Sequence, residues 1–186
     1  MVPITSLWIP ILLSAVIVFV VSSIIHMVLP YHRTDFRKVA AEDEVMEALR
    51  KFNIPPGDYA IPCPEGPAGM KKPEFIEKLK QGPHVFMTLS PGGTPAMGKY
   101  LFQWFIYCLL IGIFAAYITG RALGPGAPYL AAFRFAGTTA FAGYSLALLQ
   151  NSIWMRRAWS TTLKSVFDGL IYGLMTAGTF GWLWPR

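Results

Sequence analysis

Charge is scarce in this sequence, and the scarcity is uneven. Only 14% of the 186 residues are charged, whereas an ordinary soluble domain carries roughly a quarter. Ten basic and nine acidic residues lie between Tyr31 and Lys99, and the rest of the chain holds six basic residues and a single carboxylate, Asp168. A soluble enzyme of ordinary composition and a disordered protein are therefore excluded. The sequence predicts a lipid-compatible part joined to a water-compatible part.

Cysteine and the common catalytic motifs are also scarce. The two cysteines, Cys63 in a polar segment and Cys108 in an apolar run, are expected to be free thiols. The three histidines show no short metal-ligand spacing, and the sequence has neither a Gly-x-Ser-x-Gly motif nor a glycine-rich phosphate loop. We therefore predict no catalytic residues, no metal site and no cofactor, and a non-enzymatic role is favoured.

Four long apolar runs are present instead. A membrane-spanning helix needs roughly 20 apolar residues. The first run, Leu7 to Leu29, carries no charge, is too long for the core of a signal peptide and has no basic segment before it. The sequence predicts an integral membrane protein, mainly α-helical, with four transmembrane helices. The expected bounds are residues 1–30 for the first helix and about 100–122, 129–150 and 163–184 for a three-helix bundle within residues 99–186.

Lys and Arg flank the apolar runs unevenly, and these residues favour the cytoplasmic side of a membrane. We expect a multi-pass protein of the cell (inner) membrane, with both termini periplasmic or extracellular, because this orientation places most flanking basic residues in the cytoplasm. The cytoplasmic basic residues are then Arg33, Arg37, Lys38, Lys99, Arg156, Arg157 and Lys164, against Arg121, Arg134 and Arg186 on the other side.

The polar insert between the first two runs, residues 31–98, is 68 residues long and is expected to be cytoplasmic. Its nine prolines and seven glycines are typical of short helices joined by turns, with little or no strand. Apolar spacing predicts helices at about Lys38–Phe52 and Pro73–Gln81, a short strand at Val85–Leu89 and irregular structure over residues 54–69. Because large apolar side chains are few, we expect the insert to lean on the bilayer surface, the helix ends or another protein.

Small residues recur every four positions in the apolar runs. Such rows let two helix backbones approach closely, which is how helices associate in lipid. Two interpretations remain open: packing among the helices of one chain, and packing against a second copy or another subunit. The predicted helix-packing residues are Gly169, Gly173, Ala177 and Gly181 in the last run, with Gly112, Ala116 and Gly120 in the second.

Each apolar run also carries a polar residue near its predicted cytoplasmic end. Ionisable groups at membrane depth are costly, and they often mark functional sites. One interpretation is a hydrogen-bonded network in which Lys164, four residues before Asp168, is its local partner. The other is a layer that relays protons or binds a ligand. The predicted layer consists of His26, Gln103, Gln150, Asn151 and Asp168.

By elimination, the predicted function is that of an accessory, structural or assembly subunit of a membrane protein complex, acting through helix packing and the insert. The expected partners are the lipid bilayer and other membrane subunits or a second copy. The net charge of +6 lies beside apolar runs rather than in a basic patch, so nucleic acid is excluded. The alternatives are a small oligomeric channel or transporter that uses the polar layer around Asp168, and a membrane enzyme or cofactor-binding subunit.

Overall fold

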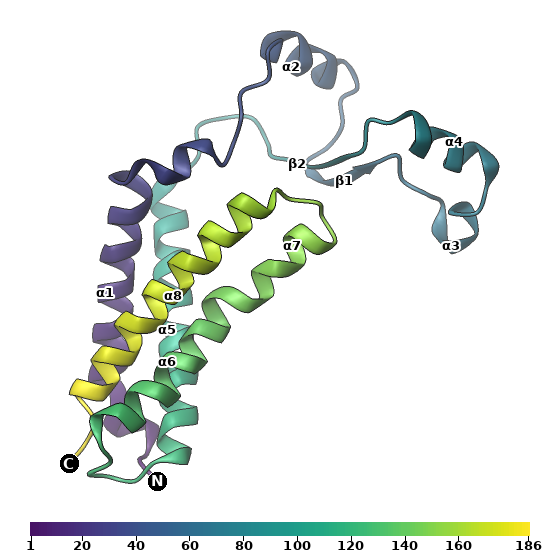
Figure 1. Cartoon of the computed structure of the whole chain (residues 1–186). Coiled ribbons are helices and arrows are strands. Elements are labelled where there is room, and N and C mark those ends of the chain that lie inside the picture. Colours follow the sequence, from purple (N-terminus) through teal and green to yellow (C-terminus); the bar gives the residue numbers. More distant parts are fainter. The chain divides into compact units, whose positions relative to one another are not determined.

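The computed structural model describes every residue from Met1 to Arg186 (Figure 1). The chain divides into a helical unit, Met1–Phe36 with Ala96–Arg186, and an insert unit, Arg37–Pro95. Each unit is described by itself. The chain is mainly helical, with two short strands. Residues 31–36, which the sequence assigned to the insert, belong to the helical unit.

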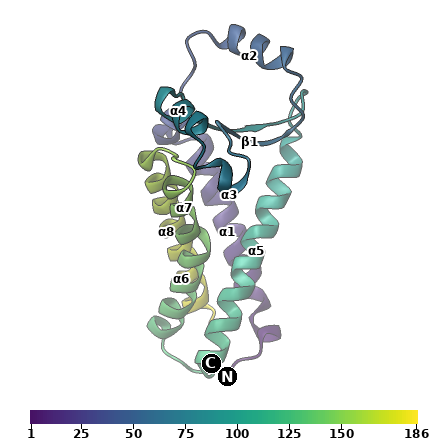
Figure 2. The ribbon, with the colours of Figure 1, turned by 90° about the vertical axis from the view of Figure 1, so that its right-hand side faces the viewer.

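The helical unit is built from long helices that lie side by side (Figure 2). Helix α1 packs against α5 and α8, and α6 packs against the same two helices, so each long helix has two neighbours. The elements of this unit are η1 (Ile4–Leu7), α1 (Trp8–Met27), η2 (Pro30–Thr34), α5 (Met97–Ala122), α6 (Tyr129–Ser145), η3 (Leu146–Leu148), α7 (Leu149–Ile153) and α8 (Trp159–Trp182).

Proline and glycine set several of the helix ends. Leu29 is extended (φ −77°, ψ 138°) because it precedes Pro30, and a residue before proline avoids the helical region. Helix α5 stops at Ala122, just before the glycine- and proline-rich connection to α6. Pro30 begins the short 3₁₀ turn η2, which follows α1 and contacts it.

The third predicted helix differs from its expected bounds of 129–150. It is interrupted at Ser145, whose backbone (φ −124°, ψ −51°) leaves the helical region and begins the 3₁₀ turn η3. The Ser145 hydroxyl donates a hydrogen bond to the carbonyl of Val166 in α8, 3.3 Å away. Helix α6 is therefore tied to α8 at the residue where it bends.

The core of the helical unit consists largely of small side chains. Alanines of α5 and α6 are almost completely buried, together with a few large residues such as Leu7 and Phe180. Small side chains let helix axes approach closely. One group of buried residues comprises Val2, Leu7, Ala115, Ala116, Ala132, Ala136, Phe180 and Trp184, and a second comprises Ala15, Val18, Ile25, Cys108, Ile111, Ala140, Tyr144 and Tyr172.

The insert unit contains two helices, a helical turn and an antiparallel pair of strands. Strand β1 (Gly57–Ile61) pairs with β2 (Val85–Leu89), in a register that places Tyr59 opposite Met87. The strand at Val85–Leu89 is therefore confirmed, but the expectation of irregular structure over residues 54–69 is wrong. The helices of this unit are α2 (Glu42–Lys51), the short α3 (Gly66–Gly69) and α4 (Pro73–Gln81), of which α4 matches its prediction and α2 begins four residues late.

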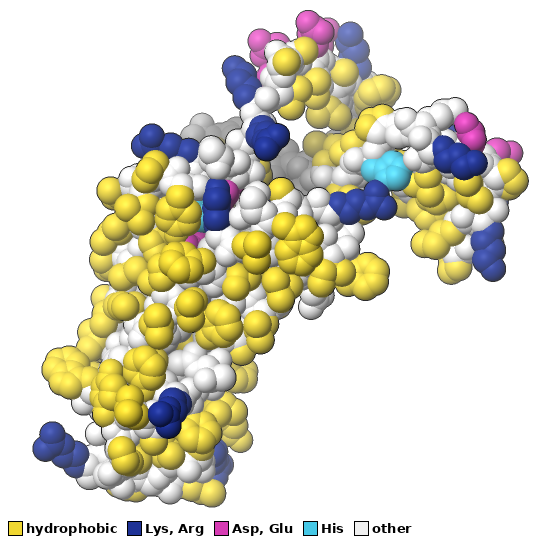
Figure 3. All heavy atoms as spheres, viewed as in Figure 1, with side chains coloured by type: hydrophobic (Ala, Val, Ile, Leu, Met, Phe, Trp, Pro, Cys, Tyr) yellow, Lys and Arg dark blue, Asp and Glu magenta, His cyan; other side chains and the backbone are white.

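Two helical segments, Ile4–Met27 and α5, are long and apolar enough to cross a membrane. Many large apolar side chains of the helical unit are exposed, and they cover much of the face shown in Figure 3. Helices α6 and α8 do not meet the same criterion: α6 has 17 residues, and α8 is rich in glycine and threonine. Of the four expected spans, two are therefore supported by length and hydropathy.

Candidate functional site

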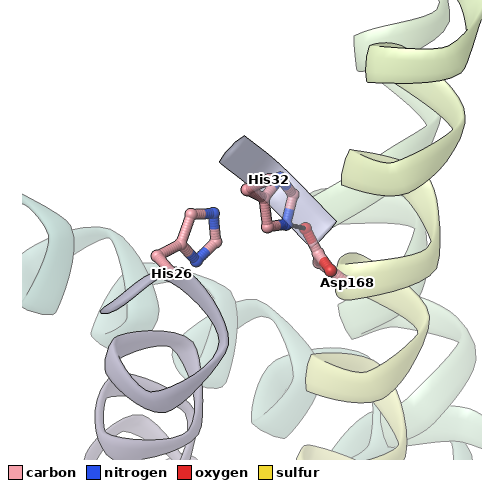
Figure 4. A group of neighbouring side chains, drawn as sticks. All are labelled: His26, His32 and Asp168. Atoms are coloured by element: carbon pink, nitrogen blue, oxygen red, sulfur yellow. Dashed lines mark ion pairs between the residues drawn. The ribbon is translucent and has the colours of Figure 1, made fainter. Parts of the chain in front are cut away.

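A group of titratable side chains gathers where α1, η2 and α8 meet. His26 lies in the last turn of α1, His32 lies in η2, and Asp168 lies in the third turn of α8, one turn beyond Lys164. Each offers one nitrogen or oxygen atom, and these atoms all lie within 4.8 Å of one another. The three side chains converge from three separate elements (Figure 4). We call this group the His–His–Asp cluster.

His32 lies between two carboxylates. Its Nδ1 is 2.7 Å from Oδ2 of Asp35, and its Nε2 is 2.9 Å from Oδ2 of Asp168. The first contact has the geometry of a hydrogen bond, but the second does not. Because a carboxylate has no proton to give, we assign the Nδ1 proton to His32. The buried Nε2 therefore faces a carboxylate oxygen at close range without a hydrogen bond between them.

Asp168 is 3% exposed, and its carboxylate has a second contact besides the one with His32. The hydroxyl of Tyr31 donates a short hydrogen bond to its Oδ1. Burial together with the Asp168 carboxylate raises the pKa of the Tyr31 hydroxyl, so this group stays protonated and remains a donor. A buried carboxylate is costly unless it is paired, and here both of its oxygens face partners in η2.

Lys164 does not pair with Asp168, contrary to the prediction from their spacing. Its ammonium lies 2.9 Å from Oδ1 of Asp35, and it also donates to the backbone carbonyl of Tyr31 and the hydroxyl of Thr34. Burial disfavours the charged form of Asp35, but the hydrogen bonds from His32 and Lys164 outweigh this effect and lower the pKa of its carboxyl. Lys164 thus clamps η2 onto α8 and keeps Asp35 ionised beside His32.

His26 is the exposed member of the cluster. Its ring is stacked on that of His32, with centroids 4.5 Å apart and planes inclined by 9°. Its Nδ1 lies 3.0 Å from the backbone carbonyl oxygen of Ser22, one turn earlier in α1. A carbonyl oxygen only accepts, so Nδ1 of His26 carries a proton, and in the neutral imidazole Nε2 has the lone pair.

The predicted polar layer is only partly assembled. His26 and Asp168 come together, but Gln103 and Gln150 are exposed, and neither of them nor the half-buried Asn151 takes part in the hydrogen bonds of the cluster. The four helices therefore do not each contribute one polar group to a common layer. Sequence reasoning missed His32 and Tyr31 as members because both fall in the segment that was assigned to the insert.

The small-residue row of α8 faces α6. A Cβ added to Gly173 would lie 3.1 Å from Cβ of Phe141, and one added to Gly181 would lie 2.7 Å from the Tyr129 ring. Gly169 abuts Ser145, and Ala177 lies against Gly137. The row that was predicted in the last run therefore packs within the chain.

The row of α5 faces the first helix rather than α6. A Cβ on Gly112 would lie 3.3 Å from the carbonyl oxygen of Ile11, and one on Gly120 would lie 2.5 Å from that of Val2. Ala116 is completely buried beside them. The two predicted rows thus serve two different helix pairs, α1 with α5 and α6 with α8.

Comparisons with known proteins add no relative. No protein-family model matches the chain, and neither the curated proteins nor the solved structures contain a significant match.

Proposed function

We propose that this chain is a four-span integral membrane protein that acts as an accessory or assembly subunit of a membrane protein complex, with its insert as the docking element. In this proposal the partners are the lipid bilayer and another membrane subunit. The single observation that carries the docking role is the lack of a packed core in the insert unit.

The insert unit buries almost nothing within itself. Gly69 is its one buried residue, whereas the apolar faces of its helices are exposed, including Val45, Met46 and Phe52 at the end of α2. Exposed apolar faces on an amphipathic helix are typical of segments that dock into a groove of another protein. The acidic residues in the first turn of α2 and the basic residues in its last turn interact favourably with the helix dipole and stabilise the helix. The apolar face of α2 is then available for a partner.

The four-span arrangement is supported by how α6 and α8 divide their side chains. The glycines and threonines that lower the hydropathy of α8 point into the bundle, while Leu163, Phe167 and Leu170 are exposed. An apolar outer face suits lipid, and polar or small residues suit the helix interface. Helix α6 alone is about 26 Å long at 1.5 Å per residue, but η3 and α7 continue the helical path to Ile153.

A photocrosslinking amino acid at Met46 tests the docking role, with the same amino acid at Glu47 as the matched control. Met46 lies on the apolar face of α2, whereas Glu47 lies about 100° around the helix from it, on the side away from Val45 and Leu49. In native membranes we expect a crosslink to one membrane subunit from Met46 only. On a native gel, Met46→Lys should release the chain from that subunit, and Glu47→Lys should not.

Two outcomes would contradict the docking role. Equal crosslinking from both positions would mean random encounter, and crosslinking of Met46 to lipid alone would mean that the bilayer surface covers α2. A second candidate function, a cofactor-binding membrane protein, is favoured by a specific observation, the His–His–Asp cluster, and the cluster leads to the following inference.

A further inference from the structure

We propose that His26, His32 and Asp168 bind one divalent transition-metal cation through two imidazole nitrogens and one carboxylate oxygen. This inference does not depend on the docking role of the insert, because all three residues belong to the helical unit. It also departs from the expectation, drawn from sequence spacing, that the chain has no metal site.

The geometry carries the argument, because one ligand atom from each of His26, His32 and Asp168 lies within 4.8 Å of the other two. Both Nδ1 atoms face acceptors, the Asp35 carboxylate for His32 and the Ser22 carbonyl for His26, so both carry protons. Both Nε2 atoms therefore keep lone pairs in the neutral imidazoles. A histidine that binds a metal in proteins has this arrangement, with one nitrogen free for the cation and the other donating to a carboxylate or a backbone carbonyl.

The Asp168 carboxylate is also held by a hydrogen bond from a residue outside the cluster. Oδ1 of Asp168 accepts the Tyr31 hydroxyl, and Oδ2 faces Nε2 of His32. Every proposed ligand is thus held from outside by one hydrogen bond, from or to Asp35, Ser22 or Tyr31. Outer hydrogen bonds of this kind orient metal ligands, and their loss typically weakens metal binding by about 10–100-fold.

The contact between Nε2 of His32 and Oδ2 of Asp168 is 2.9 Å long but is not aligned as a hydrogen bond, so neither atom is committed to the other. With neutral histidines, the hydrogen-bonded group holds two carboxylates, Asp35 and Asp168, and one ammonium, Lys164. This excess of negative charge favours a bound cation.

The ligand set and its exposure indicate the class of metal. Two imidazoles and one carboxylate suit zinc and ferrous iron rather than magnesium or calcium, which prefer oxygen ligands alone. Ligand atoms held at about 2.0–2.2 Å from one cation lie at most about 4.4 Å apart, so the group must close. Because the two imidazole rings are stacked nearly parallel, the His26 ring must also turn to aim its Nε2 lone pair at the cation. The exposed His26 side chain can provide that movement. Three protein ligands leave a coordination position open to water, as in catalytic rather than structural sites.

Zinc binding to the whole chain tests the proposal. The protein is purified in detergent, stripped with a chelator, and titrated with Zn²⁺ alone in competition with a chromophoric chelator. We expect one Zn²⁺ per chain. Because a lost ligand costs more than a lost outer hydrogen bond, His26→Gln, His32→Gln and Asp168→Asn should each weaken binding by more than about 100-fold. Asp35→Asn should weaken it by about 10–100-fold, as expected of a positioning residue.

Two other residues that could bind Zn²⁺, His84 and Cys63, serve as controls. His84→Gln and Cys63→Ser, both in the insert unit, should leave the affinity for Zn²⁺ unchanged. Loss of binding in either would overturn the proposal, and so would equal affinity of the wild type and the double variant His26→Gln/His32→Gln. If Asp168→Asn does not fold, His26→Gln still decides the matter, because His26 is exposed. Replacing Zn²⁺ by Co²⁺ gives a spectroscopic check on the wild type, whose visible absorption should indicate nitrogen and oxygen ligands without sulfur.

Discussion

Replacement of Gly173 by alanine should destabilise the helical unit, whereas the same change at Gly178 should not. A Cβ at position 173 would lie 3.1 Å from Cβ of Phe141, 3.2 Å from its backbone nitrogen and 3.3 Å from the carbonyl oxygen of Gly137. These separations are shorter than ordinary van der Waals contacts, and two of them involve backbone atoms of α6. A Cβ at position 178 would meet only the Tyr129 hydroxyl, at 3.8 Å.

The size of the effect follows from two opposing contributions. Alanine is better than glycine in a helix interior by about 1 kcal/mol, and this gain is the same at both positions. Overpacking at a tight contact costs about 1–3 kcal/mol. Gly178→Ala should therefore be up to about 1 kcal/mol more stable than the wild type, and Gly173→Ala between equal and about 2 kcal/mol less stable. The difference between the two variants is the packing cost alone.

Thermal unfolding of both variants in one detergent, followed by far-ultraviolet circular dichroism, measures this difference. For a chain of this size, about 1 kcal/mol shifts the Tm by about 2–4 °C, so the two midpoints should differ by about 2–12 °C. Equal midpoints would refute the close approach of α6 and α8 at Gly173. Gly173→Leu should be more harmful than Gly173→Ala, because a branched side chain cannot fit against the α6 backbone.

Three further predictions concern topology and the polar contacts. A membrane-impermeant maleimide should label the exposed Cys63 in inside-out vesicles but not in intact cells, and labelling of intact cells would reverse the proposed orientation. In chelator-treated protein, Asp168→Leu should cost about 1.5–3 kcal/mol, because Tyr31 loses a charged acceptor, whereas Asp168→Asn should be milder; equal unfolding midpoints would contradict this. Trp104→Phe removes the 2.8 Å hydrogen bond from the indole nitrogen to the Ser22 hydroxyl and should lower stability by about 0.5–1.5 kcal/mol, and an unchanged denaturation midpoint would exclude that contribution.

The helical part of the fold could be predicted from the sequence because its signals are local. The breaker cluster before Pro128 ends one helix and begins the next, and the start of α4 at Pro73 follows from the same rules. Strand β1 was missed because prolines surround a run of only five residues, and its hydrogen bonds depend on a partner far along the chain. The bend at Ser145 was missed as well, since nothing in the residues near it interrupts the apolar pattern.

The site was harder to predict, because its members come from distant parts of the sequence. His26 and Asp168 were both predicted near one end of the bundle, and the structure brings them into one cluster. Lys164 was assigned to Asp168 by helical spacing, but it contacts Asp35 because η2 folds back over α8. A chain reversal of this kind leaves no periodic pattern in the sequence from which it could be predicted. The segment at residues 31–36 carries charges like those of the insert, and charge therefore grouped it with the insert, whereas its contacts group it with the helical unit.

The pairing of α1 with α5 has a consequence for how the chain is made. The two helices contact each other at Gly112, and Gly120 contacts Val2 just before the first helix, but the whole insert separates α1 from α5 in the sequence. A ribosome adds about 5–20 residues per second, so α1 is complete several seconds before α5 exists. During that time its future interface, which includes Ser14 and Ser22, has no partner helix.

The two serines are suited to this delay. The hydroxyl of Ser14 bonds to the carbonyl of Ile11, and that of Ser22 bonds to the carbonyl of Phe19, both within α1 itself. A hydroxyl that is satisfied by its own helix imposes little penalty in lipid, where an unpaired polar group would be costly. In the proposed membrane topology, α1 can therefore stay in the bilayer before α5 is made without leaving these two serine hydroxyls unpaired.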